Sequence, residues 1–511
     1  MMMRAQSWVL VSLLLLLEVL CSRVDASNPG IVVRITQKGL NYACAKSVIT
    51  LEKKLLTITL PDFQGDFKIK HFGRGDYHFK SLNIQSVELK NSKLDLVPGE
   101  GLEASISNAF IRVDGDWKAR KSFVKVSGSF DLQVKGISIS VSLRLSSDSS
   151  GRPTVTSKQC SSHIADVDLD ISGKIGWLLN LFRNHIESKF RRILQDEICE
   201  IVKKSVASDL QPYLQSLPVI AKIDNIASMD YALVGPPQAT SYSLDTPFKG
   251  EFFRRSHRSP VPFELPAMNL PEDHDLMVYF GISDSVFNTA SQVYWEAGTM
   301  NYTITDDMIP SSFRIRLITS SFRALVPQLG KLYPNMPMEL QVTTSSPPAM
   351  VFSPGNVTLT PVMDLQAFVV QPNSLRVPLF LLSVTTTVWA TVGVNGSRIV
   401  SSITPGSSLT MELKHSDIGP INVPLIQAIL NYYALSTLLP AVNENLEIGF
   451  PLPLPRNIQL QDLLVQTYQV SEKMLEGKVC RGMVDGPFSG AMSNSGGWDG
   501  VCVCVCVCVC V

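Results

Sequence analysis

The chain has 511 residues, enough for two to four domains. Its 45 Lys and Arg residues balance its 45 Asp and Glu residues, and this zero net charge argues against nucleic-acid binding over the whole surface. Because 45% of the residues are hydrophobic and only 18% are charged, the composition excludes a disordered chain and allows a large apolar core.

The first 26 residues have the pattern of a secretory signal peptide. Arg4 is followed by a short apolar run, and Val24-Asp25-Ala26 offers small residues for cleavage before Ser27. The alternative, an anchoring helix, is less favoured because the run is too short to cross a bilayer comfortably. We therefore expect a secreted, extracellular and soluble protein, and we expect it to be a monomer.

The first half reads as a helix, then strands, then a long helix. Residues 40–56 are predicted to be helical, and 67–72 and 82–94 to be strands. Apolar residues alternate from Phe130 to Leu145 with one slip at Gly136, which predicts a long, bent strand with a bulge. Apolar residues at helical spacing over 175–201 predict an amphipathic helix that ends at Pro212. Periodicity alone favours a helix packed in the core over one that lines an acyl-chain tunnel.

A proline-rich segment, residues 235–271, is predicted to be a semi-rigid linker between two domains, 27–234 and 272–470. The second half repeats the order of the first, with helices expected over 285–298 and 418–448 and strands between them. The first half to Gly235 carries 28 basic and 22 acidic residues, and the rest carries 15 and 21. A basic front half indicates an anion-facing end, although chance asymmetry remains an alternative.

Motifs for catalysis are missing. The chain contains no Gly-x-Ser-x-Gly, no His-Glu-x-x-His, no phosphate-binding loop and no dinucleotide-binding glycine pattern. His71 and His78 are a weak metal candidate, and Asp166, Asp168 and Asp170 are expected to form a solvated strand face rather than a calcium site. We therefore expect no enzyme activity, no metal and no cofactor.

Ten cysteines are present, and five of them lie in the last ten residues. Cys44, Cys160, Cys199 and Cys480 remain in the body of the mature chain, and some are expected to pair in an oxidising compartment, with the pairing left open. Three sequons predict N-glycosylation at Asn301, Asn356 and Asn395.

The densest basic cluster of the first half follows the turn signal Asp114-Gly115-Asp116. Its members are Lys118, Arg120, Lys121 and Lys125. Such side chains suit phosphate through charge-assisted hydrogen bonds. An anion site or lipid-head-group site and an ordinary solvated loop remain equal alternatives for this cluster.

Many segments in order make the chain similar to a known family. They are NPGIVVRITQKGLNYA at 28–43, FKIKHFGRG at 67–75, CSSHI at 160–164, MVYFGISD at 277–284, DDMIP at 306–310, PNM at 334–336, LKHSDIGP at 413–420 and GFPLP at 449–453. The chain resembles the family of bactericidal permeability-increasing protein, lipopolysaccharide-binding protein and lipid-transfer proteins, the BPI fold, and looks closest to its C-type member.

The resemblance implies an α+β boomerang of two pseudo-symmetric domains. Each would be a twisted antiparallel barrel with long helices, and a central sheet would join them. It also implies a Cys160–Cys199 disulfide and two apolar pockets that hold bound phospholipid. Helix residues expected to line these pockets are Leu178, Phe182, Ile186 and Phe190 in the first half, and Leu425, Ile429 and Tyr432 in the second.

Two departures from the family shape the expected function. Residues 56–60 are uncharged where the bactericidal member is basic, so the main expectation is binding or transfer of phospholipids. The alternative is innate-immune recognition of bacterial lipopolysaccharide, or of an anionic membrane surface, through the basic cluster. In the tail, 471–511, the family's closing strand is not recognisable and Val alternates with Cys. A translated GT repeat is favoured there over a genuine strand or metal-binding tail.

Overall fold

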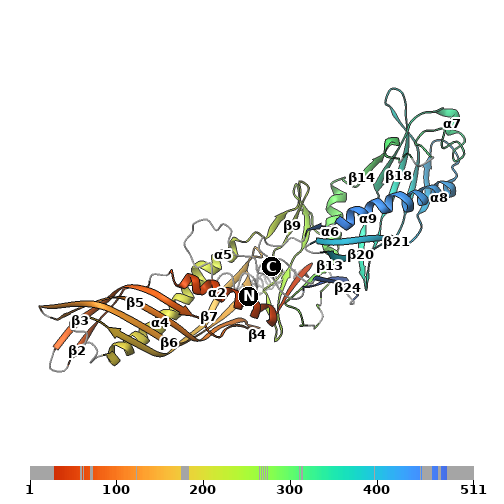
Figure 1. The fold of residues 1–511 in the computed structure, drawn as a ribbon. Coiled ribbons are helices and arrows are strands. Elements are labelled where there is room, and N and C mark those ends of the chain that lie inside the picture. Colours follow the sequence, from red (N-terminus) through yellow and green to blue (C-terminus); the bar gives the residue numbers. More distant parts are fainter. Residues whose placement is uncertain are drawn as a thin grey trace, which may run out of the picture.

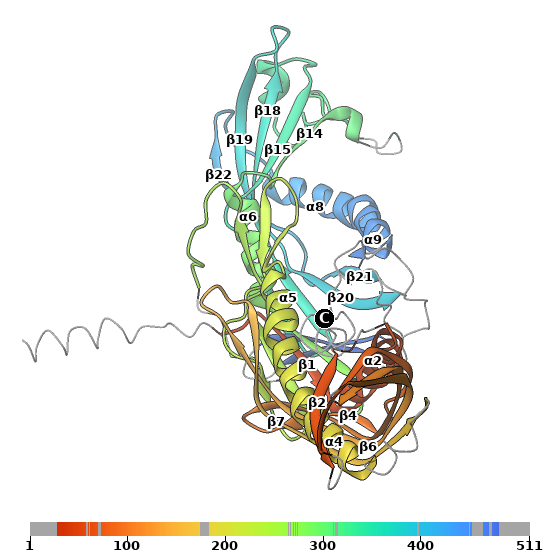
Figure 2. The same cartoon turned by 90° about the vertical axis from the view of Figure 1, so that its left-hand side faces the viewer.

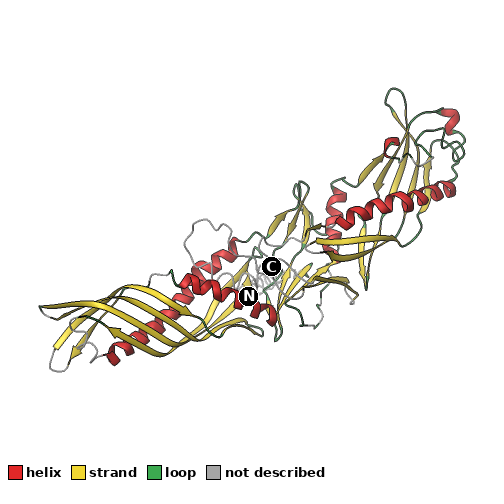
Figure 3. Ribbon diagram, viewed as in Figure 1, coloured by secondary structure: helices red, strands yellow, loops and turns green. Residues whose placement is uncertain are grey.

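The computed structural model describes residues 28–479 apart from 58–59, 61, 70–72, 122, 174–182, 264, 266, 269, 271, 273, 310, 312–314, 396–397, 449, 452–462 and 470–472. The molecule is elongated, with one half on either side of a central sheet (Figure 1). Helices and strands occur in both halves (Figure 3). The predicted signal peptide and the Val/Cys repeat lie outside the described residues.

The first half is one curled antiparallel sheet with two helices. After β1 (Ile31–Thr36), the chain forms α2 (Gln37–Leu55), β2 (Phe63–Ile69), β3 (Gly73–Glu88), β4 (Ser92–Val97), β5 (Gly101–Lys121), β6 (Val124–Ser147) and β7 (Pro153–Ile171). The strand order is β2-β3-β5-β6-β7, with β4 paired to β5. Gly136 has a φ of +64° and is skipped between the pairs Phe110–Lys135 and Ala109–Ile137, so the predicted bulge is confirmed.

The long helix of this half continues past the proline that was expected to end it. It runs through α4 (Arg183–Ser205), the π-helix η1 (Val206–Leu210) and α5 (Gln211–Ser216). Pro212 has no N–H and its ring would clash with the carbonyl four residues earlier. A wider turn removes this conflict, and the N–H of Gln211 donates to the carbonyl of Val206, five residues back.

The second half contains two five-stranded sheets and a similar interrupted helix. One sheet has the order β14-β15-β18-β19-β22, and the other has the order β16-β17-β20-β21-β23. The bounds are β14 (Asn301–Ile304), η2 (Asp306–Met308), α7 (Leu329–Leu332), β15 (Met338–Thr344), β16 (Ala349–Ser353), β17 (Asn356–Thr360), β18 (Val362–Val370), β19 (Arg376–Thr385), β20 (Val388–Asn395), β21 (Arg398–Pro405), β22 (Thr410–Ser416) and β23 (Phe450–Pro451).

The helix of the second half runs through α8 (Val423–Tyr433), η3 (Ala434–Leu438) and α9 (Leu439–Ile448). Again a π-helix precedes a proline, Pro440, at the second position of the next helix. The two halves therefore share a local solution to the same backbone problem, although their residues differ.

The central sheet joins the two halves. Its order is β10-β11-β1-β13-β25-β24, with β10 (Gln238–Ala239), β11 (Ser243–Phe248), β13 (Val278–Ser283), β24 (Leu463–Gln469) and β25 (Lys473–Val479). β1 and β13 pair antiparallel, and each is followed at once by a helix, α2 or α6 (Asp284–Glu296). A three-stranded sheet lies beside it, formed by β8 (Ile220–Lys222), β9 (Ala227–Asp230) and β12 (Glu251–Arg254).

Two expectations about this region need correction. The proline-rich segment 235–271 is not simply an extended connector, because β10, β11 and β12 lie within it and β11 pairs with β1 over six residues. Prolines are tolerated where strand pairing does not need their N–H. The predicted second domain also stops short of β25, which pairs with β13 beyond residue 470.

The expected α+β architecture of two halves joined by a central sheet is confirmed, with curled sheets in place of barrels. Cys160 and Cys199 form a disulfide with a Cα–Cα distance of 5.7 Å, which ties β7 to α4. Cys44 is buried and forms no disulfide. Separate apolar cores fill the base of the first half, its distal end and the second half.

Candidate functional site: a basic hairpin tip and an apolar cavity

The basic cluster lies at the tip of the β5–β6 hairpin. Arg120 pairs with Lys125 and Lys121 with Val124, so only residues 122 and 123 connect the strands. Lys118, Arg120 and Lys125 are exposed, while Trp117 and Ala119 between them are buried. Strand alternation therefore gathers three cations on one outer face. In the described part of the chain, none of these three makes an ion pair.

Phe123 lies at the turn itself and is fully exposed, at 101% of its reference area. The sequence-based expectation did not single out this residue. The sequence feature that could have identified it is an aromatic residue in a two-residue turn between two strands of alternating polarity. A large apolar side chain in water is unfavourable by about 1.5–3 kcal/mol relative to burial, so an apolar contact at this position would be favourable.

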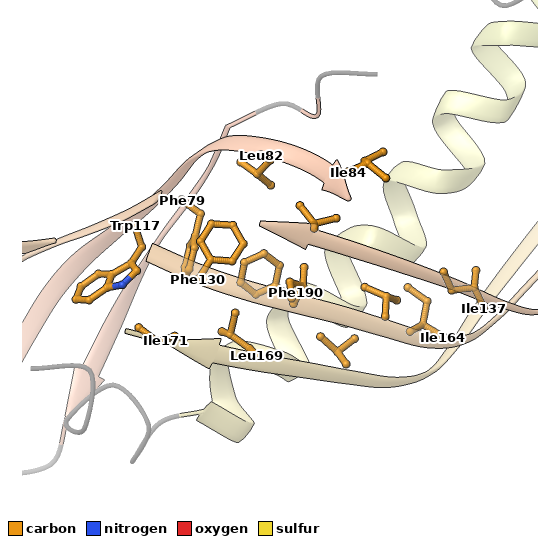
Figure 4. Packing of buried hydrophobic residues seen from close by; sticks show 14 of the residues in the cluster. Phe79, Leu82, Ile84, Trp117, Phe130, Ile137, Ile164, Leu169, Ile171 and Phe190 are labelled. Atoms are coloured by element: carbon orange, nitrogen blue, oxygen red, sulfur yellow. The ribbon is translucent and has the colours of Figure 1, made fainter. Parts of the chain in front are cut away.

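Aromatic packing holds the tip in place (Figure 4). Phe79 makes edge-to-face contacts with Phe130 and Phe190, with ring centroids 4.9 and 5.0 Å apart. Trp117 is 1% exposed, and its indole N–H donates to the Ser172 carbonyl at 2.9 Å. Burial, followed by the Asp66 carboxylate, raises the pKa of the neighbouring Tyr77. The tip is thus an extension of a rigid, apolar interior.

Acidic side chains lie on the same outer face as the cations of the tip. Asp116 precedes Lys118 by two residues on β5, and Asp76 on β3 pairs with Arg120. A polar hollow of about 560 Å³ on the same sheet is lined by Asp114, Asp116, Asp131 and Asp170 with serines and Asn83. Carboxylates repel phosphate, so this hollow does not suit an anionic head group. The expected solvated acidic face is present, since Asp166 and Asp170 are exposed and Asp168 lies near Lys135. Among the described residues, no group of three or more His, Cys, Asp or Glu side chains has the arrangement of a metal site.

The second half contains an apolar cavity between α8 and its sheet. Its volume is about 70 Å³, and its lining is almost entirely hydrophobic. The lining residues are Ile304, Ile309, Ile315, Leu317, Phe322, Leu325, Leu340, Leu365, Phe380, Ile426, Ile429, Leu430 and Tyr433. This volume is below the ~300–1,000 Å³ of ordinary ligand pockets, so a long acyl chain requires α8 to move away from the sheet.

An ion pair fastens one wall of this cavity. Arg316 donates two hydrogen bonds to Asp306 Oδ2, at 3.2 and 2.8 Å, and the backbone N–H of Leu317 donates to Asp306 Oδ1 at 2.7 Å. These bonds, led by the one from Arg316, lower the pKa of Asp306. The wall therefore stays ordered near neutral pH without a charge inside the cavity.

The predicted lining residues have mixed positions. Ile429 lines the cavity, whereas Leu425 and Tyr432 are 41% and 64% exposed and do not. Phe190 is 2% exposed within the aromatic cluster of the first half. Leu178 and Phe182 lie outside the described residues, and for Ile186 only the helical backbone is described. Periodicity identified the apolar helices but not which apolar face meets the sheet.

The three predicted glycosylation sites also differ in position. Asn301 begins the edge strand β14 and is exposed, and Asn395 is exposed at the end of β20. Asn356 is half-buried at the start of β17. All three remain predictions of modification.

Comparisons with known proteins agree with this architecture. The N-terminal domain of the LBP / BPI / CETP family matches residues 39–213, and its C-terminal domain matches residues 221–474. Human lipopolysaccharide-binding protein is 56% identical over 87% of this chain and 92% of its own length. Rat bactericidal permeability-increasing protein is 40% identical over 90% of this chain and 95% of its own length. A crystal structure of lipopolysaccharide binding protein superposes with a TM-score of 0.59 at 51% identity, covering 89% of this chain and 98% of that one.

The fold and the site define a lipid-binding protein of two joined α+β halves. The chain belongs to the LBP / BPI / CETP family. The expectation that the chain is most similar to the family's C-type member is wrong. The human family C protein is only 26% identical over 88% of each chain, whereas the human lipopolysaccharide-binding protein is 56% identical.

Proposed function

We propose that this protein recognises bacterial lipopolysaccharide outside the cell, through the tip of the β5–β6 hairpin. Of the two functions expected from sequence, the relatives' names favour this one. The observation that carries it is the exposed Phe123 between exposed cations on one hairpin. The predicted signal peptide and the Cys160–Cys199 disulfide support an extracellular location.

The chemistry of the tip suits a phosphorylated glycolipid. Lys118, Arg120 and Lys125 would donate charge-assisted hydrogen bonds to phosphate oxygens. Phe123 would enter the adjoining acyl layer, which removes its ring from water. Charge would thus bring the tip to the lipopolysaccharide surface, and the apolar contact of Phe123 would slow its dissociation. Binding and release of a lipid need no covalent step, and we propose no catalysis.

The test is binding to purified lipopolysaccharide by a triple variant, Lys118→Gln, Arg120→Gln and Lys125→Gln. We expect affinity to fall about tenfold or more at low salt, since ~1.4 kcal/mol is a factor of ten. Wild-type binding should weaken as salt rises, and that of the variant should respond less. A control with Lys203, Lys204 and Lys222 changed to Gln removes the same charge from exposed positions elsewhere and should bind normally. Equal loss in both variants would contradict the assignment.

Phe123→Ser separates the two contributions at the tip. We expect this variant to keep the salt dependence of the wild type but to dissociate faster, because the charged contacts remain and the apolar contact is lost. The measurement is dissociation from immobilised lipopolysaccharide at two salt concentrations. Unchanged dissociation would remove Phe123 from the site.

A second candidate function is binding of a phospholipid chain in the cavity of the second half. The hydrophobic lining supports it, and burying each methylene contributes about 0.8 kcal/mol. The test is mass spectrometry of organic extracts from the purified secreted protein. We expect phospholipid in the extract, and less of it after Ile429→Asp, which puts a charge in the lining. Lipid-free protein that also takes up no fluorescent phospholipid would exclude this function.

A further inference from the structure

The helix formed by α8, η3 and α9 carries apolar residues on the face that packs against the sheet and also on exposed faces. By length and composition it is the one helix among the described residues that is suited to crossing a membrane, yet only 6% of its most apolar 18-residue stretch is buried. Helices that are hydrophobic all round are usually buried in protein or lipid. In Figure 2, α8 lies at the lower end of the β15–β18–β19 sheet, and α9 continues away from that sheet toward β21.

Two neighbouring faces of the helix have different surroundings. Ile426, Ile429 and Leu430 line the cavity. Leu425 and Tyr432 are exposed and lie two turns apart, roughly 100° around the axis from Ile426. Leu435 and Leu438 extend this exposed surface along η3, at 43% and 54% exposure. We call Leu425, Tyr432, Leu435 and Leu438 the outer face. This face meets the cavity lining at Leu425, which is one turn before Ile429.

The charge pattern indicates which partner fits. No charged residue occurs from Val423 to Asn443, and the first charges after it are Glu444 and Glu447. A helix that binds anionic lipid carries Lys or Arg on its polar side. An uncharged face with leucines and an exposed tyrosine instead complements a layer that has no net charge, with the tyrosine at the boundary between acyl chains and water.

We propose that the outer face docks on a zwitterionic phospholipid layer, and that the adjoining cavity takes an acyl chain directly from it. The second part rests on the phospholipid-binding function proposed above. Leu425 of the outer face lies one helical turn before Ile429 of the cavity lining, so the proposed path of the chain runs between these two residues. The outward movement of α8 that a chain requires breaks the hydrogen bonds that Gln427 and Asn431 accept from the backbone N–H groups of Met411 and Leu409, at 3.1 and 3.3 Å.

The test compares two triple variants in sedimentation with phosphatidylcholine vesicles. Leu425→Ser, Leu435→Ser and Leu438→Ser alters the outer face. Ile220→Ser, Ile223→Ser and Leu375→Ser makes the same kind of change at positions that are 50%, 46% and 54% exposed elsewhere. High salt screens attraction through the basic tip. All six positions are exposed, so both variants should fold, which thermal unfolding checks.

We expect the outer-face variant to lose vesicle binding by about tenfold or more and the control to bind like wild type. Lipopolysaccharide binding at the hairpin tip should not change in either. Equal binding by both variants, or no vesicle binding by wild type at high salt, would overturn the proposal. A wild-type dimer that the outer-face variant converts to a monomer would also overturn it, since the face would then be a self-association surface.

Failure of this inference can be told from failure of the phospholipid-binding function. Phospholipid extracted from a protein that does not bind vesicles would remove the docking surface and leave the cavity function standing. Vesicle binding that depends on the outer face, by a protein whose extracts and uptake assays show no lipid, would remove the cavity function and leave the docking surface.

Discussion

At the scale of single residues, a tyrosine joins the second half to the loop before β9. Tyr294 on α6 donates a hydrogen bond to Asp224 Oδ2 at 2.7 Å. Asp224 also accepts from the backbone N–H groups of Ile226 and Ala227, both at 2.7 Å. The Ala227 bond first, then those from Tyr294 and Ile226, lower the pKa of Asp224. Burial and then Asp224 raise the pKa of Tyr294 to about 12.

We expect Tyr294→Phe to lower the melting temperature by a few degrees at pH 7 and by less in acid. A carboxyl whose pKa is lowered on folding stabilises the protein above its unfolded pKa, and this contribution is lost as the pH falls through the folded pKa. Protonated Asp224 no longer holds the tyrosine bond as a charged acceptor. Thermal scans from pH 7 to pH 2 measure the difference. Tyr302→Phe, at 61% exposure, is the control and should match wild type at every pH.

At the scale of elements, the disulfide joins the long helix to the sheet that carries the tip. Cys160 lies on β7 and Cys199 on α4, 39 residues apart. Besides the disulfide, hydrogen bonds attach the helix to β7, from Ser162 to the Gln195 carbonyl at 2.6 Å and from the backbone N–H of Leu169 to Glu187 at 3.0 Å. The disulfide limits how far the sheet and the helix separate when the chain unfolds.

We expect the double variant Cys160→Ser, Cys199→Ser to lose up to about 4 kcal/mol of unfolding free energy, the chain-entropy value for a loop of this length. Urea unfolding measures it, and a reducing agent should destabilise wild type but not the variant. Cys44→Ser is the control, because Cys44 is a buried cysteine that forms no disulfide. A control that lost as much would show that thiol chemistry, not the cross-link, sets the stability.

At the scale of the whole molecule, the two halves share strands and contacts. β1 and β13 pair over five residues in the central sheet. Between β1 and β11 of the same sheet, Arg34 donates to both carboxylate oxygens of Asp245, at 2.8 and 2.6 Å. Thr289 on α6 accepts from the backbone N–H of Phe252 at 3.1 Å. Each half therefore supplies a strand that pairs with an edge strand of the other half.

We expect fragments 28–263 and 274–479 to co-purify when they are expressed together, because the first carries β1 and the second carries β13 and β25. Each alone exposes unpaired strand edges and should aggregate or remain unfolded. Affinity capture through a tag on one fragment measures association. Two soluble fragments that do not associate would show that each half is an independent domain.

Local patterns in the sequence determined most of the elements and the family. Alternation and helical spacing predicted α2, α6, the bulged strand at Gly136 and the two long helices, because those periods follow from backbone geometry. Segment resemblance indicated the disulfide pair. The density of Lys and Arg in the sequence identified the basic cluster. Strand pairing in the structure then placed Lys118, Arg120 and Lys125 on one face.

Only the tertiary structure decided which surfaces meet. The proline-rich segment joined the central sheet because β1 offered it an edge, which no local pattern reveals. Pro212 did not end its helix, since packing favours a π-turn over a break. Leu425 and Tyr432 have the same apolar character as Ile429, yet they face solvent, because burial depends on the position of a distant sheet rather than on the residues themselves.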